Sequence, residues 1–250
     1  MAKLFDPLLK NEHSKRLYQK LGRRRPYVER KPTKHYRIKQ LNDNGGWLVL
    51  NHYRGPKIAA SHWQTLKYLE YATDKENQFA PLASATGKVE LDPFWDHGKP
   101  DKDGVLTANA NQAPALVKWV KSVRANFGRL QLIRQHPSSL REARYAIHLD
   151  DNNRLNPSTA GWVVRVWLEL THDPDSYMIL REQEFDRKSE VRISLPRYRQ
   201  MVIDSERLFH AVFNSSGRPR YALIASFESG PALERWIKQQ GVIDWQSPRL

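Results

Sequence analysis

Three residues of the sequence have the types and spacing of a metal site. His148 and Asp150 stand two residues apart in His148-Leu149-Asp150, so on extended backbone both side chains project from the same face. His210 lies within the otherwise apolar run of residues 208–213. Together they would supply two imidazoles and one carboxylate to one side of a metal. An Fe(II) that activates O₂ requires this arrangement, because its remaining positions must stay free.

The absence of cysteine narrows the chemistry open to the chain. With no cysteine among 250 residues, disulfides, thiolate zinc sites, iron–sulfur clusters and a cysteine nucleophile are all excluded. Imidazole and carboxylate remain as the metal ligands. A serine hydrolase is also disfavoured, since the sequence has no Gly-x-Ser-x-Gly motif.

Each of these features also has a plainer explanation. In a chain with nine histidines, one His-x-Asp pair arises readily by chance, and such a pair is often an ordinary surface feature. A single histidine on an apolar strand is more often a structural residue whose ring nitrogens bind neighbouring groups. Arg220, at the start of the run of residues 220–224, adds weight to the functional interpretation. A cation on an inward-facing strand needs a carboxylate partner, and a bound dicarboxylic acid could provide one.

The elements that must position these residues are short strands. From Leu130 onward, β-prone runs alternate with polar turns, and several of them, such as Val191–Leu195, are apolar at every second residue. Eight strands of this kind predict a double-stranded β-helix, or jelly roll, within a β-rich α+β fold. The predicted strands are residues 130–134, 144–148, 162–170, 177–180, 191–195, 200–203, 209–213 and 221–227.

Supporting elements are predicted on both sides of this core. Residues 47–50 form a strand after a glycine pair, and apolar spacing predicts helices over residues 61–72 and 116–127. Residues 96–112 are predicted to be a long loop near the mouth of the site. A last helix over about residues 231–240 follows Gly230-Pro231. The predicted organisation is a basic arm, residues 1–45, and one domain, residues 46–250, with its jelly-roll core at about residues 130–228.

The positive charge is concentrated in the arm. The net charge is +14, and residues 1–45 contribute 13 − 4 = +9 of it. This segment could attract nucleic acid or could simply be solvated, and the sequence leaves both interpretations open. No run of about eighteen apolar residues is present, so we expect no membrane association and a cytoplasmic protein. The oligomeric state is not indicated.

The region of about residues 130–228 resembles the aspartyl/asparaginyl β-hydroxylase-like superfamily of Fe(II)- and 2-oxoglutarate-dependent oxygenases, which includes bacterial cis-prolyl hydroxylases. The matching features are a strand that ends in a proline, a middle strand that carries an arginine, and a closing series of polar residues. In this sequence they are His136-Pro137, Val164–Leu168 with Arg165, and then Asp204, His210, Asn214 and Arg220.

The resemblance implies roles for individual residues. His148, Asp150 and His210 would be the Fe(II) ligands and the catalytic centre, Arg220 would bind the distal carboxylate of 2-oxoglutarate, and Arg165 would help to hold cosubstrate or substrate. The implied cosubstrates are 2-oxoglutarate and O₂, and the implied reaction is hydroxylation of an unactivated C–H bond.

One position departs from the family pattern, because Trp167 stands where a histidine is typical. The favoured substrate is a free amino acid or a small derivative, since the chain is short and no peptide-binding module is visible. Alternatives are a protein or nucleic-acid-associated target, and a metal-free jelly roll that binds nucleic acid through the basic arm.

Overall fold

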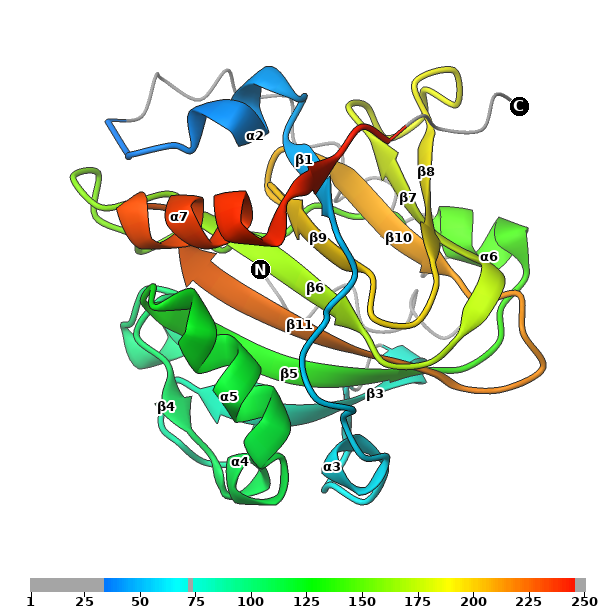
Figure 1. Cartoon of the computed structure of the whole chain (residues 1–250), viewed down its shortest axis with the longest axis horizontal. Coiled ribbons are helices and arrows are strands. Elements are labelled where there is room, and N and C mark those ends of the chain that lie inside the picture. Colours follow the sequence, from blue (N-terminus) through cyan, green and yellow to red (C-terminus); the bar gives the residue numbers. More distant parts are fainter. Residues whose placement is uncertain (1–33, 72–73, 246–250) are drawn as a thin grey trace, which may run out of the picture. The chain divides into compact units, whose positions relative to one another are not determined.

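A computed structural model of the chain describes residues 34–71 and 74–245 (Figure 1). Its helices are α2 (Lys39–Asp43), α3 (Ser61–Gln64), the 3-10 helix η3 (Phe94–His97), α4 (Ala108–Gln112), α5 (Pro114–Val123), α6 (Leu140–Tyr145) and α7 (Pro231–Gln240). Its strands are β1 (Trp47–Leu50), β2 (Leu69–Tyr71), β3 (Asp74–Ser84), β4 (Val105–Leu106), β5 (Phe127–Gln135), β6 (Val163–Glu169), β7 (Asp173–Arg181), β8 (Val191–Leu195), β9 (Gln200–Ile203), β10 (Phe209–Phe213), β11 (Arg220–Glu228) and β12 (Val242–Ile243).

Two antiparallel sheets make up the described part of the chain. The larger has the order β12-β1-β9-β6-β11-β5-β3-β2, with β4 paired to β3, and the smaller has the order β10-β7-β8. Strands distant in the sequence lie side by side: β11 pairs with both β5 and β6, and β10 pairs with β7. A chain that alternates between two sheets in this way forms a jelly roll, so the predicted fold class is confirmed.

Alternating side chains divide the core into two layers. On β11, Leu223, Ala225 and Phe227 belong to the apolar cluster that includes α5 and α7, and Figure 1 shows those two helices beside each other along the large sheet. The neighbouring positions, such as Ala222, face the small sheet and pack with Trp167 and other residues of the second cluster. The period-two pattern of the sequence therefore separates a helix-covered face from the interior between the sheets.

The two longest helices begin and end where local sequence requires it. Both carry a proline in the first turn, where the missing N–H costs no hydrogen bond. After α5, Arg124 adopts a left-handed conformation (φ 58°) and ends the helix. The predicted helix over residues 231–240 is confirmed, with Leu233, Trp236 and Ile237 buried. No helix in the described ranges is both long and apolar enough to cross a membrane.

Three sequence predictions need correction. Residues 144–148 are not a strand, because Ser139 and Glu142 form a reciprocal capping box that starts helix α6 instead. The helix predicted over residues 61–72 ends at Gln64, since Leu69 pairs with Phe79 at the edge of the large sheet. The predicted loop over residues 96–112 contains β4 and α4, the latter capped by the Thr107 side chain.

The predicted basic arm falls mainly on residues 1–33, outside the described residues. The following segment belongs to the packed part of the chain. Ile38 and Leu41 are almost completely buried in the main apolar cluster, and Tyr36 forms backbone hydrogen bonds with residues 160 and 162. Whether the arm contacts nucleic acid stays a prediction.

A single carboxylate holds the outer side of the small sheet to α6. The Glu190 side chain is fully buried and accepts hydrogen bonds from three arginines: Arg144 of α6, Arg181 of β7 and Arg192 of β8. Burial alone would raise the pKa of Glu190, but the three arginines outweigh it and lower this pKa to about 2. The carboxylate therefore stays ionised and connects three elements.

We expect Glu190→Gln to reduce the free energy of unfolding by about 2–3 kcal/mol at pH 7, because it removes one partner of a buried ion cluster. The folded-state pKa lies below the unfolded value of roughly 4.3, so this contribution is complete above that value and is lost as the pH falls towards 2.

Thermal melts of wild type and variant between pH 7 and pH 2.5 measure both effects. The difference in stability should shrink steadily below about pH 4. Glu182→Gln, at an exposed position nearby, is the matched control and should leave stability unchanged. An equal difference at pH 7 and at pH 3 would contradict the assignment.

Candidate metal centre

A two-way backbone contact brings the predicted ligands together. The N–H of His148 donates to the carbonyl of His210 at 3.1 Å, and the N–H of His210 donates to the carbonyl of His148 at 2.9 Å. The segment after α6 thus pairs with β10 at this single point. One residue further, the Asp150 N–H donates to the Ser205 carbonyl at 2.9 Å. These bonds fix where three side chains leave the backbone.

Both imidazoles are held with one nitrogen free. His148 Nδ1 lies 2.9 Å from the Ala146 carbonyl, and His210 Nδ1 lies 3.1 Å from the Leu208 carbonyl. A carbonyl oxygen only accepts, so each Nδ1 carries the hydrogen and each Nε2 presents a lone pair. Metal-binding histidines are oriented by such backbone contacts. The two rings lie 4.5 Å apart between centroids.

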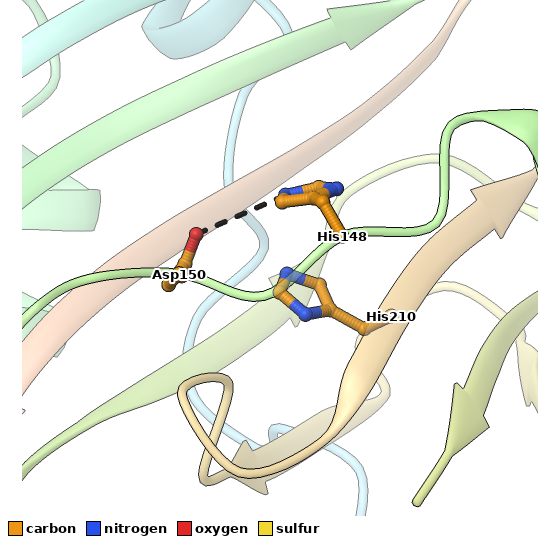
Figure 2. Close-up of side chains that lie close together, drawn as sticks. All are labelled: His148, Asp150 and His210. Atoms are coloured by element: carbon orange, nitrogen blue, oxygen red, sulfur yellow. Dashed lines mark ion pairs between the residues drawn. The ribbon is translucent and has the colours of Figure 1, made fainter. Parts of the chain in front are cut away.

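The Asp150 carboxylate has one oxygen occupied and one facing the histidines. Oδ2 accepts hydrogen bonds from Arg165 Nε at 3.0 Å and from Ser205 Oγ at 2.8 Å. Oδ1 lies 3.8 Å from His148 Nε2, and Figure 2 shows the three side chains converging. One donor atom of each of His148, Asp150 and His210 lies within 4.8 Å of the others, so the predicted ligands do meet.

Protonation in the folded protein suits metal binding. Burial lowers the pKa of His210 to about 4, so this imidazole is neutral at physiological pH. Burial on its own would raise the pKa of Asp150, but the Arg165 charge and the two nearby imidazoles hold this pKa well below its usual range. A neutral imidazole and an ionised carboxylate are the forms that coordinate a cation.

Exposure differs across the three ligands. His210 is buried, while the His148 side chain is 48% exposed. A metal held there would therefore be protected on the β10 side and accessible from the His148 side. This leaves room for further ligands, as a facial set of two histidines and one carboxylate requires.

Sequence reasoning did not identify the residues that hold the carboxylate in place. Arg165 is buried in β6, donates to Asp150, and also contacts Asp101 at 3.4 Å and the Ser226 hydroxyl. Ser226 in turn donates to Asp101 at 2.9 Å. Asp101 comes from the polar segment between η3 and β4, which carried only a composition signal for proximity to the site. The predicted contact of Arg165 with a cosubstrate stays a prediction, while its observed contact is with Asp150.

Arg220 lies inside the fold on the same face as Ala222, and it is almost completely buried. Its guanidinium donates to the Glu169 carboxylate, and to Gln135 Oε1 at 3.1 Å. Arg220 Nε has no hydrogen-bond partner among the described residues. Burial raises the pKa of Glu169, an effect that the Arg220 charge opposes. The cation predicted to bind a dicarboxylic acid thus already has one carboxylate partner.

The remaining residues of the resemblance have structural contacts. Asp204 is buried and accepts from the Trp162 indole N–H at 3.0 Å, and the Asn214 amide donates to the carbonyls of Gln135 and Arg218. Trp167, at the position where a histidine is typical, is buried with its ring centroid 6.0 Å from that of His210. It supplies an apolar wall beside the buried ligand.

Comparisons with known proteins bear on the fold. No protein-family model and no curated protein matches the sequence. Among solved structures, a 2OG-Fe(II) oxygenase family oxidoreductase from Burkholderia pseudomallei is similar with a TM-score of 0.50 and 14% identity, over 79% of this chain and 95% of that one. At this identity the similarity shows a shared fold, in agreement with the strand order described above.

Two other solved structures are similar with lower TM-scores. A Trichoplax adhaerens prolyl hydroxylase in complex with a hypoxia inducible factor peptide fragment has a TM-score of 0.47 and 15% identity, over 78% of this chain and 88% of that one. A Pseudomonas putida prolyl-4-hydroxylase has a TM-score of 0.40 and 15% identity, over 76% of this chain and 97% of that one.

We expect the full-length protein to bind one Mn(II) or Fe(II), and we expect His148→Ala and His210→Ala each to weaken binding by about a hundredfold or more, because each removes a direct ligand. Calorimetric titration with Mn(II) measures this. His52→Ala, at an exposed histidine outside the cluster, is the matched control and should bind as wild type does. Undiminished binding by both ligand variants would exclude the assigned centre.

Proposed function

We propose that this protein is an Fe(II)- and 2-oxoglutarate-dependent dioxygenase that hydroxylates an unactivated C–H bond. The observation that carries the proposal is the convergence of two free imidazole Nε2 atoms and one free carboxylate oxygen at one point of a jelly roll. This donor set fits Fe(II) with open positions. With iron and 2-oxoglutarate bound, oxidative decarboxylation of the 2-oxo acid supplies the oxidising power for hydroxylation.

The chain's own residues have distinct tasks in this proposal. His148, Asp150 and His210 hold the iron, and Arg165 and Ser205 hold Asp150 Oδ2 so that Oδ1 is turned towards the histidines. Trp167 excludes water beside His210. Dryness on this side protects an oxidising centre from side reactions.

The resemblance of residues 130–228 to the aspartyl/asparaginyl β-hydroxylase-like superfamily supports a free amino acid, or a small derivative of one, as the substrate. A larger peptide or protein substrate is a second candidate, favoured by one observation. Leu149, between two of the ligands, is 40% exposed, and Leu155 is similarly exposed on the following loop. Apolar side chains beside an open site favour a partner that covers them.

Substrate-stimulated formation of succinate from 2-oxoglutarate tests the proposed function. We expect Fe(II)-loaded protein to give succinate above its uncoupled rate with at least one member of a panel of free amino acids, and His210→Ala to give none, since it lacks a metal ligand. A second panel of short peptides tests the larger substrate. Absence of 2-oxoglutarate turnover by wild-type protein with bound Fe(II), in every panel, would contradict the proposal.

We further propose that Arg220 binds the distal carboxylate of 2-oxoglutarate. Its position supports this: it is inward-facing on β11, and it pairs with Glu169, two residues beyond Trp167 on β6. A cosubstrate carboxylate would therefore compete with Glu169 for the guanidinium. A buried arginine satisfied by an internal carboxylate is a weaker anchor than a free one.

This competition predicts opposite effects of two isosteric variants. Glu169→Gln should tighten 2-oxoglutarate binding by severalfold, because it removes the competing charge. Adding Arg220→Gln to it should then weaken binding by about tenfold or more below wild type, because it removes the cation without leaving Glu169 ionised and unpaired. Calorimetric titration of Mn(II)-loaded protein measures both affinities. Equal affinity in the single and double variants would show that Arg220 is not the anchor.

A further inference from the structure

A cavity of about 880 Å³ opens at the end of the fold where β6 finishes and β11 begins. It is lined by residues 57–60, 63–64, 170–173 and 216–221, together with Arg197 of the turn between β8 and β9. This volume lies within the range of small-molecule sites. The metal ligands are not among its lining residues.

The cavity lies at a distance from the metal centre. Arg165, which contacts Asp150, is near the start of β6, whereas Leu170, on the cavity wall, follows the end of that strand. Five residues of extended chain separate the two by about 17 Å. Ser226 and Arg220 on β11 have the same relation, with Ser226 near the metal and Arg220 on the cavity wall.

The charge around the cavity is strongly positive. Lys57, Arg197, Arg218 and Arg220 all line it, against one acidic residue on the wall, Asp173. Arg220 pairs with Glu169, but no ion pair in the described part of the chain neutralises Lys57, Arg197 or Arg218. Several cations left unpaired around a concave surface focus a positive potential into it.

Buried donors without partners add a second, independent indication. Arg220 and Trp63 are both more than nine-tenths buried and both line the cavity. Arg220 Nε and Trp63 Nε1 have no hydrogen-bond partner among the described residues. Buried N–H groups are rarely left unsatisfied in native structures, so a ligand that accepts hydrogen bonds here would offset their cost.

Part of the wall is apolar. Ile58, Leu170 and Tyr221 contribute buried side chains, and the Tyr221 ring contacts that of Trp63 at 4.6 Å between centroids. An inorganic ion alone would leave this surface in contact with water. A carbon skeleton that carries the negative groups would cover it.

We propose that this cavity is a second ligand site that binds a small organic anion with at least two negative groups, either phosphates or carboxylates. The exposed cations Lys57 and Arg218 bind its outer groups, and the buried donors of Arg220 and Trp63 accept an inner one. This inference does not depend on the proposed oxygenase activity, because none of these interactions involves the metal.

Titration calorimetry on the full-length protein tests the site with two probes, inorganic pyrophosphate and citrate, at constant ionic strength. The two probes distinguish phosphate from carboxylate sources. We expect one site with a dissociation constant below about 1 mM for at least one probe. Lys57→Glu/Arg218→Glu should weaken that binding by roughly tenfold or more, because it reverses two charges. Raising the salt concentration should weaken the wild-type interaction as well.

Two controls separate this site from other sources of anion binding. Lys118→Glu/Lys121→Glu makes the same change in charge on the exposed face of α5 and should leave probe binding as in wild type. His210→Ala should also bind as wild type does, which excludes chelation of a bound metal by the probe. Absence of saturable binding of both probes to wild type, or unchanged binding to Lys57→Glu/Arg218→Glu, would overturn the proposal.

Discussion

The reciprocal hydrogen bonds between His148 and His210 are the contact on which the candidate site depends. They join two residues that lie 62 positions apart, at one bridge between the segment after α6 and β10. Because the bridge fixes both backbones, each imidazole can donate to the carbonyl two residues before it and turn its Nε2 towards the same point. Asp150, two residues beyond the bridge, completes the set without a strand of its own.

Charge is arranged around this bridge in pairs rather than singly. Asp150 is buried beside Arg165, Arg165 is shared with Asp101, and further along the interior Arg220 is matched by Glu169. Isolated charges at these depths would be costly, so each cation stabilises a carboxylate that the fold has already buried. A consequence is that the interior offers few unpaired cations to an incoming acid. The largest unneutralised positive charge surrounds the cavity at the far end of β6 instead.

The sequence predicted well those features that depend on periodicity. Alternation identified β8, β9 and β10 to the residue, and the meeting of His148, Asp150 and His210 followed from two-residue spacing together with the return of a distant strand. It failed where a local signal competed with apolar spacing, as when the Ser139 capping box produced α6 in place of a strand. It also could not find partners fixed only by tertiary structure. Nothing near Asp101 or Glu169 in the chain announces contact with Arg165 or Arg220, because those contacts arise from sheet register and loop packing.

The central claim is that the folded chain presets a metal site of two imidazole Nε2 atoms and one oxygen of Asp150. The most direct measurement is a crystal structure of the protein with Mn(II), with the metal located by its anomalous scattering. The account predicts one ion bound by His148 Nε2, His210 Nε2 and Asp150 Oδ1, with Arg165 still bonded to Asp150 Oδ2. An ion bound instead at the other potential cluster, Glu90, Asp92 and His97, or coordination through the Nδ1 atoms of His148 and His210, would contradict it.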